Sequence, residues 1–199
     1  MARFHTFSSY DEYVKAQKHL TMRKVGAGRT RCFVARDEVH SISEYHKKIG
    51  KVENGMCHGV RLGKELDMFE EEFGEGKWVG TEIVAELCDG VRIFNADFSH
   101  IRDEWVGTFD VIFSNSLDHS HTPFKTVKAW VACLSPTGRL YVEWTPWHNK
   151  LGGFGACADC YAANEEEYFE LFRSVGKIEA VLVVNAEGEN FYRKIYVVY

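Results

Sequence analysis

The densest polar cluster of the sequence is Ser114-Asn115-Ser116-Leu117-Asp118-His119-Ser120-His121. It brings hydroxyls, a carboxyl group and two imidazoles together, and imidazoles and carboxyls are the side chains that most often move protons in enzymes. His119 is the first candidate for a general base, with Asp118 to orient its ring, and His121 or His148 could serve instead. In the alternative interpretation, Asp118 caps a turn and one histidine packs against a sheet. The cluster predicts a proton-transfer site with His119, Asp118 and His121 as candidate catalytic residues.

A metal site is a second interpretation of the same cluster, because further histidine and cysteine residues occur at His148, Cys157 and Cys160. Zinc sites use paired cysteines and histidines at short spacings. A single Cys-x-x-Cys without a second pair is weak evidence, and residues two apart on a strand face opposite ways. The sequence therefore favours a protein without a bound metal. A redox role is disfavoured as well, since this Cys-x-x-Cys follows a glycine-rich loop instead of opening a helix.

A glycine turn, Gly59-Val60-Arg61-Leu62-Gly63, lies between a predicted strand and a predicted helix. Glycines permit a tight turn and let a ligand approach the backbone, while the N–H groups that open the helix suit a carboxylate. Glu82 ends the next predicted strand, roughly twenty residues farther on, where a carboxylate can accept both hydroxyls of a ribose. Taken alone, the turn could be only a turn and Glu82 a solvated charge. Together they favour a site for a nucleoside-containing cofactor.

Short apolar segments alternate with helical patterns from Gly55 onward, which is typical of βαβ units around a parallel sheet. We expect strands at residues 55–58, 78–83, 91–96, 109–114, 140–144, 178–184 and 194–198. We expect helices at residues 64–73, 84–87, 123–134 and 165–174. Too few residues separate the last two strands for a crossover helix, so these strands must pair antiparallel. The predicted fold is a doubly wound α/β fold with a seven-stranded, mostly parallel sheet and an antiparallel last strand.

The first fifty residues predict a helical cap over a single compact domain that spans residues 51–199. Ser9 can N-cap a helix over residues 10–23, and a second short helix is expected over residues 41–49. The Gly-containing segment 25–29 between them follows no strand, which disfavours a phosphate-binding loop.

The composition bounds the class of protein. The chain has 199 residues, 45% of them hydrophobic and 27% charged, as in an ordinary globular domain. A net charge of −5 disfavours nucleic acid and anionic membranes as partners. The start of the chain shows no secretory pattern, so a cytoplasmic location is expected, and Cys88 and Cys133 are predicted to be buried and reduced. The sequence does not indicate an oligomeric state.

Residues 55–199 resemble the class I S-adenosylmethionine-dependent methyltransferases. In that family the glycine turn holds the methionine part of the cofactor and an acid after the second strand binds the ribose, as Glu82 would. The resemblance implies that Asp97 addresses the adenine amino group, that Phe98 covers the ring, and that residues 109–116 end in a segment facing the substrate. The cofactor-binding residues that it implies are Gly59, Arg61, Gly63, Glu82, Ile83, Asp97, Phe98, Asn115 and Ser116.

The sequence departs from the family pattern acid-x-Gly-x-Gly-x-Gly at Cys57, where the acid is expected, and at Arg61, where the middle glycine is expected. Arg61 must point away from the backbone cradle, or bind the cofactor carboxylate or a substrate anion. The favoured hypothesis is a methyltransferase that acts on a small-molecule or saccharide-like acceptor at oxygen or nitrogen. The alternative is a noncatalytic or lapsed adenosyl-binding domain that acts through a partner. A nicotinamide-dependent oxidoreductase would need a Gly-x-Gly-x-x-Gly turn, which is missing.

Acceptor specificity is expected to come from the cap and from the segment 144–161, whose glycine-rich part predicts a loop that covers the site. Four aromatic residues lie in this segment and could contact an acceptor or pack within the covering loop: Trp144, Trp147, Phe154 and Tyr161.

Overall fold

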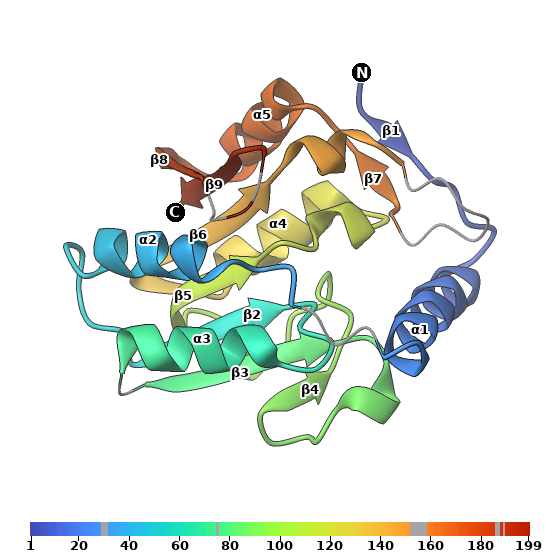
Figure 1. The fold of residues 1–199 in the computed structure, drawn as a ribbon, viewed down its shortest axis with the longest axis horizontal. Coiled ribbons are helices and arrows are strands. Elements are labelled where there is room, and N and C mark those ends of the chain that lie inside the picture. The colour runs from blue at the N-terminus through green and yellow to red at the C-terminus, as the bar shows by residue number, and fades with distance from the viewer. Residues whose placement is uncertain (29–31, 75, 152–158, 186–187, 189) are drawn as a thin grey trace.

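The structure is a computed structural model that describes residues 1–28, 32–74, 76–151, 159–185, 188 and 190–199. Its centre is a seven-stranded sheet in the order β4-β3-β2-β5-β6-β9-β8 (Figure 1). The strands are β2 (Asn54–His58), β3 (Lys77–Glu82), β4 (Ile93–Asn95), β5 (Phe109–Ser114), β6 (Leu134–Trp144), β8 (Ile178–Val184) and β9 (Arg193–Val198). The strands from β4 to β6 are mutually parallel, and β9 runs antiparallel to both of its neighbours. The predicted fold class is confirmed.

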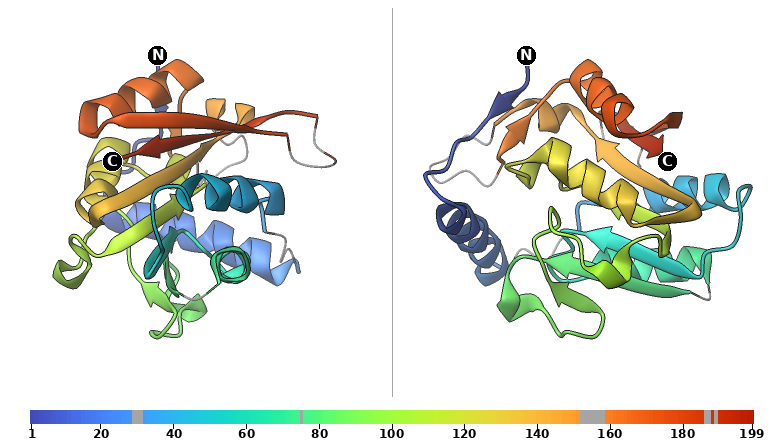
Figure 2. Two further views of the ribbon diagram at one scale, coloured as in Figure 1. Left: turned by 90° about the vertical axis from the view of Figure 1, so that its left-hand side faces the viewer. Right: turned by 180° about the vertical axis from the view of Figure 1, so that it is seen from behind.

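Helices cover both faces of this sheet, as Figure 2 shows from two further sides. The helices α2 (Arg36–His46) and α3 (Lys64–Phe73) pack on one face, while α4 (Pro123–Ala132) and α5 (Glu165–Val175) pack on the other. Successive residues of a strand point to opposite faces, so β9 contributes Ile195 and Val197 to one core and Tyr196 and Val198 to the other.

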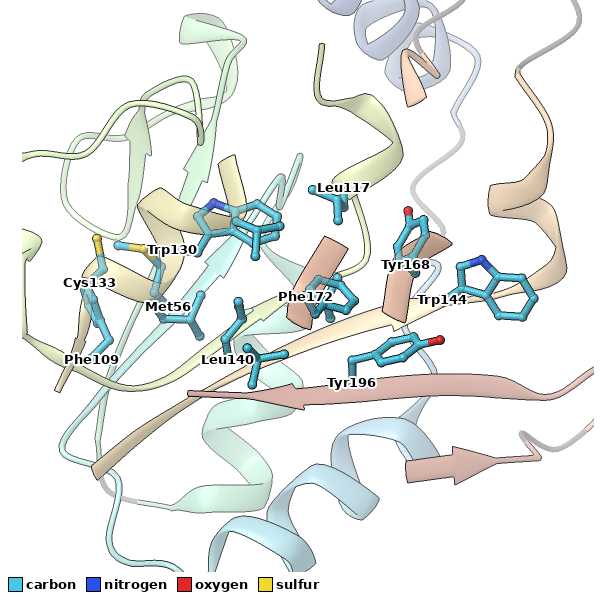
Figure 3. Close-up of a cluster of buried hydrophobic side chains, with 14 of the residues drawn as sticks. Met56, Phe109, Leu117, Trp130, Cys133, Leu140, Trp144, Tyr168, Phe172 and Tyr196 are labelled. Atoms are coloured by element: carbon cyan, nitrogen blue, oxygen red, sulfur yellow. The ribbon is translucent and has the colours of Figure 1, made fainter. Parts of the chain in front are cut away.

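The core under α4 and α5 is rich in rings (Figure 3). Trp130 of α4, Phe172 of α5 and Leu140 of β6 are each at most 1% exposed. Burial of a large apolar side chain contributes about 1.5–3 kcal/mol, so these contacts fix the strands firmly. The strand ends, and with them the polar residues that follow, are held at defined positions.

Helix α1 (Tyr10–Gly26) lies apart from these layers, beside the carboxyl ends of the parallel strands (Figure 1). The Ser9 side chain accepts a hydrogen bond from the Glu12 N–H, as predicted for the N-cap, and the helix ends three residues later than predicted. A two-stranded pair, β1 (Arg3–Phe4) with β7 (Tyr161–Ala162), was not predicted, because two-residue strands leave no alternating pattern in a sequence.

Several predicted boundaries differ from the structure, and two starting positions differ by five residues or more. Helix α2 begins at Arg36 instead of at residue 41, because the Glu38 carboxylate accepts the Ala35 N–H and starts the helix earlier. Strand β6 begins at Leu134 instead of at residue 140, because Leu134 pairs with Phe109 before the register shifts. Residues 134–139, which precede the predicted strand, are therefore part of β6.

The shorter elements complete the chain. The residues 84–87, predicted as a short helix, form a single 3-10 turn at η1 (Ala85–Leu87), and similar turns follow at η2 (Asp103–Trp105), η3 (Leu117–His119) and η4 (Pro146–Asn149). Cys133 is buried as predicted, Cys88 is only half-buried, and both thiols are free. Among the described residues, no helix is long and apolar enough to cross a membrane.

Candidate functional site

The glycine turn after β2 bends through three left-handed residues. The φ angles are 78° at Gly59, 47° at Arg61 and 71° at Gly63. A Cβ on Gly59 would lie 2.8 Å from the Cβ of Ser116, so glycine is required there by backbone angle and by space. Arg61 is the only residue other than glycine with positive φ in the described part of the chain. An L-residue in this region costs about 1–2 kcal/mol, so the turn stores strain at its middle position.

The Glu82 carboxylate ties this turn to the end of β3. The Arg61 N–H donates to Oε2 at 2.9 Å and the Val84 N–H donates to Oε1 at 3.0 Å. Burial raises the pKa of Glu82, and these two N–H groups oppose the rise. Each carboxylate oxygen has two lone pairs, so both oxygens can still accept a hydroxyl.

A narrow cavity of about 60 Å³ lies between this turn and α1. It brings together Glu82, Ile83, Asp97 and Phe98, which the sequence predicted to share a site. Helix α1 closes it with Tyr13, Gln17, Thr21 and Lys24.

Both carboxylate oxygens of Asp97 accept a hydrogen bond. The Tyr10 hydroxyl donates to Oδ2 at 3.0 Å, and the Ser99 N–H donates to Oδ1 at 2.7 Å. The donors and acceptors of the cavity suit an adenosine, but its volume is well below the roughly 300 Å³ of small ligand sites. An adenosine can enter only if α1 or its side chains move.

A wider cavity of about 410 Å³ adjoins the narrow one at the carboxyl ends of β2, β5 and β6. Among the predicted residues it is lined by Asn115, Ser116, Asp118 and His119. The two cavities share Lys24, Gly59, Arg61, Ser116 and His119. A ligand that filled the narrow cavity could therefore reach into the wide one past Ser116 and His119. Gly63 lines neither cavity and instead precedes α3.

His119 lies at the junction of the two cavities. Its Nδ1 is 3.8 Å from Asp159 Oδ1, and its carbonyl oxygen accepts a hydrogen bond from the Tyr13 hydroxyl at 3.3 Å. Asp118, predicted to orient His119, has its Oδ2 4.0 Å from His148 Nε2. Burial and the neighbouring Asp118 raise the pKa of Asp159. The carboxylate that flanks the His119 Nδ1 is thus Asp159, which the sequence did not indicate.

The other two candidate histidines differ in their positions. His148 lines the wide cavity, and its Nδ1 accepts the Thr145 N–H at 2.8 Å, which places the proton of the neutral ring on Nε2. Burial lowers the pKa of His148, so the neutral ring is favoured. His121 packs against Tyr13 at a centroid distance of 4.2 Å and lines neither cavity. The structure brings His148 to the site and does not bring His121 there.

One group of side chains in the described residues has the spacing of a metal site. Ligand atoms of Asp118, His119 and Asp159 lie within 4.8 Å of one another. His148 cannot add a lone pair at Nε2, because that nitrogen carries the proton. Cys160 is buried with its sulfur 3.2 Å from Gln17 Nε2, and Cys157 lies outside the described residues.

Lys24 and Glu65 are two further charged side chains of the wide cavity that the sequence did not indicate. Lys24 and Arg61 flank the Phe33 ring at 6.0 and 5.7 Å from its centroid, and their proximity helps burial to lower the pKa of Lys24. Glu65 is 8% exposed in the first turn of α3, and burial raises its pKa to about 7. Its Oε2 lies 3.9 Å from Cys32 Sγ. Glu65 could have been found in the sequence, because it lies one turn after the glycines. No pattern in the residues around Lys24 indicates that Lys24 belongs to the site.

An ion-pair cluster forms the far wall of the wide cavity. Arg193 Nη1 donates to Glu143 at 2.9 Å and to Glu38 at 3.4 Å, and all three residues are buried. Burial and the nearby Glu38 carboxylate raise the pKa of Glu143 well above its usual range. Arg193 is therefore committed to the two glutamates and does not bring a free positive charge to the cavity.

Only some of the aromatic residues predicted near the acceptor site line a cavity. Trp147 lines the wide cavity. Trp144 is buried with its Nε1–H donating to the Ala163 carbonyl at 3.1 Å, and Tyr161 stacks on Tyr168. Phe154 and most of the predicted covering loop lie outside the described residues.

Comparisons with solved structures identify the architecture. A 1,6-didemethyltoxoflavin-N1-methyltransferase from Burkholderia thailandensis matches with a TM-score of 0.73 and 16% identity over 98% of this chain and 91% of that chain. A sugar N-methyltransferase from Streptoalloteichus sp. matches with a TM-score of 0.62 and 13% identity over 88% and 92% of the two chains. A SAM-dependent methyltransferase from Aquifex aeolicus gives a TM-score of 0.58 and 15% identity over 83% and 98%. No protein-family model and no curated protein matches the sequence. The chain has the fold of the class I S-adenosylmethionine-dependent methyltransferases.

Proposed function

We propose that this chain is an S-adenosylmethionine-dependent methyltransferase that modifies a small-molecule or saccharide-like acceptor at nitrogen or oxygen. The observation that carries the proposal is the meeting of two cavities at Gly59, Ser116 and His119. One cavity has the side chains that an adenosine needs, and the other has room for an acceptor. A methyl group could pass between them only at this junction. Named structural neighbours that act on small molecules at nitrogen support the same class of acceptor.

The adenosine end would be held by Glu82, Asp97 and Phe98. Glu82 has lone pairs left for the two ribose hydroxyls, and Asp97 could accept from the adenine amino group once Tyr10 releases it. Phe98 lines the same cavity and could cover the ring. Ile83 follows Glu82 on the cavity wall.

The amino-acid end of the cofactor carries a carboxylate and an ammonium group, and the wide cavity offers a partner for each beside the glycine turn. Lys24 and Arg61, which flank Phe33, suit the carboxylate. Glu65 suits the ammonium group, because a bound cation would lower its raised pKa and stabilise the charged carboxylate. Burial, and after it the nearby Glu65 carboxyl group, raise the pKa of the Cys57 thiol, so Glu65 lies near the position where the family pattern has its acid.

When bound, the cofactor supplies an electrophilic methyl group on sulfonium sulfur. The protein's part is to align the acceptor atom with that group and to remove a proton from it. His119 would be the base, with Asp159 stabilising the imidazolium through Nδ1. His148 already makes a hydrogen bond with the Asn115 backbone, so it would shape the acceptor space beside Asp118.

The first test is calorimetry of the full chain with S-adenosylmethionine and S-adenosylhomocysteine. We expect both to bind, and we expect His119→Ala to spare this binding while it lowers methyl transfer. Absence of binding at millimolar ligand would reject the methyltransferase and the adenosyl-binding alternative together. The second candidate function, a noncatalytic adenosyl-binding domain, is motivated by Cys57 and Arg61, and it predicts binding with no turnover on any acceptor.

A further inference from the structure

The acceptor end of the wide cavity has an excess of negative charge. Its charged lining residues are Lys24, Arg61, Lys64, Glu65, Asp118, Glu143, Asp159 and Arg193. Lys24, Arg61 and Glu65 gather at the glycine turn, where the proposed function uses them for the cofactor. Arg193 is paired with Glu38 and Glu143, and Lys64 is exposed at the start of α3. The carboxylates that remain beside the acceptor space are Asp118 and Asp159.

These two carboxylates lack a permanent cation at ion-pair distance in the described residues. Each has a histidine nitrogen near it instead, at 4.0 Å from Asp118 and 3.8 Å from Asp159. His148 is held neutral by its Thr145 contact and by burial. The two carboxylates lie close together and repel each other, and burial together with the neighbouring Asp118 raises the pKa of Asp159. A ligand that brings a positive charge would relieve this repulsion, whereas an anionic ligand would increase it.

We propose that the methyl acceptor is an amine, bound as its ammonium form between Asp118 and Asp159, with His119 placed to remove one of its protons. This inference rests on the proposed function and names the substrate class of the same site. The ligand atoms of the three residues lie within 4.8 Å of one another, so a single ammonium group can contact all of them.

The transfer step balances in charge and protons. Neutral His119 accepts one ammonium proton, which leaves a neutral amine with a free lone pair. That lone pair forms the new N–C bond as the methyl C–S bond breaks, and the electrons of the C–S bond stay on sulfur. The product is a methylated ammonium ion and a neutral thioether, and His119 returns its proton to solvent.

An alcohol fits these side chains less well than an amine. A neutral alcohol gains no charge interaction with the acid pair, and its proton is much harder for an imidazole to remove. A divalent metal would find three ligand atoms in the described residues, as many as a catalytic zinc site uses, so metal binding is an outcome that the test must distinguish.

The test uses three probes that share a ring and differ in charge: benzylamine, which is cationic at pH 7, benzyl alcohol and benzoate. Their binding to the full chain saturated with S-adenosylhomocysteine is followed by NMR titration, including the His119 ring signal. We expect benzylammonium to bind at least tenfold more tightly than benzyl alcohol, and benzoate to bind most weakly. Asp118→Asn and Asp159→Asn should each reduce this preference at least threefold while S-adenosylhomocysteine affinity stays unchanged. Asp67→Asn, a change of an exposed carboxylate on α3, is the matched control and should leave the preference unchanged.

Equal binding of the amine and the alcohol, a preference for benzoate, or no detectable benzylammonium binding would each overturn the amine site. Tight binding of Mg²⁺ or Mn²⁺ that excludes benzylammonium would overturn it in favour of a metal site. Failure of the unchanged chain to bind S-adenosylhomocysteine is a separate result. It would reject the proposed function, and the probe series on the free chain would still decide whether the acid pair selects a cation.

Discussion

Replacing Arg61 by glycine separates the cost of the strained turn from the benefit of the positive charge. The φ of 47° suits glycine, so Arg61→Gly releases about 1–2 kcal/mol of strain. Glycine adds about 0.5–1 kcal/mol of chain entropy to the unfolded state. Loss of the guanidinium from the Phe33 ring removes about 0.5–1 kcal/mol more. These contributions nearly cancel, so the free energy of unfolding should change by less than about 1 kcal/mol.

Binding should respond much more strongly than stability. If the Arg61 guanidinium holds the cofactor carboxylate, its removal costs a hydrogen bond between charged groups, worth about 1.5–3 kcal/mol. That loss corresponds to roughly a 10- to 150-fold weaker affinity. The Arg61 N–H that supports Glu82 belongs to the backbone and remains in the glycine variant.

The assay is calorimetry with two ligands, S-adenosylhomocysteine and 5′-methylthioadenosine, which has the adenosine and sulfur but no amino-acid carboxylate. Arg61→Gly should weaken the first and leave the second unchanged, and Arg61→Lys should retain part of the affinity. Equal loss for both ligands would show that the substitution acts through the turn and Glu82. No loss for either ligand would refute a contact between Arg61 and the carboxylate.

Three further variants test other parts of the structure. Glu82→Ala removes the acceptor proposed for the ribose hydroxyls and should weaken S-adenosylhomocysteine binding about 10- to 100-fold by calorimetry, and unchanged affinity would remove Glu82 from the site. Tyr10→Phe frees Asp97 from the Tyr10 hydroxyl and should tighten that binding about two- to tenfold, whereas weaker binding would show that the hydroxyl assists the ligand. His46, which contacts the Tyr141 hydroxyl at 2.9 Å, has a pKa lowered to about 4 by burial. Its neutral ring stabilises the fold fully above the unfolded pKa of about 6.5, and this stability is lost as pH falls through 4. In urea unfolding, the free energy of unfolding should therefore fall less between pH 7.5 and pH 4 for His46→Gln than for the unchanged protein. Equal falls in the two proteins would contradict this prediction.

The features that the sequence predicted correctly depend on residues that lie close together in the chain. The glycines at 59 and 63 mark a turn because their positive φ angles favour glycine, and Glu82 is recognisable because it ends a strand. The closing hairpin followed from the short spacing between β8 and β9. Each of these features depends on neighbours in the chain, so the pattern itself carries the information.

The partners in the site that were missed come from distant segments. Lys24 approaches the glycine turn only because α1 stands at the carboxyl edge of the sheet, and Asp159 reaches His119 only because the chain returns to the site just before β7. The Cys160 N–H donates to the Asp118 carbonyl at 2.6 Å and fixes this return. No spacing rule links residues so far apart, whereas Asp118 was favoured merely because it precedes His119.

The departures at Cys57 and Arg61, which suggested a lapsed domain, acquire a different meaning from their surroundings. A domain without a charged ligand has no reason to keep a buried carboxyl group at Glu65, because burial of an unpaired charge is costly. It also has no reason to keep a strained cation at Arg61 beside Lys24, where two positive charges repel each other. A ligand that carries both an ammonium and a carboxylate would offset both costs at once. Under the proposed function, Glu65 in the first turn of α3 would supply the acid missing from β2, and the two departures would mark an altered cofactor site instead of a lost one.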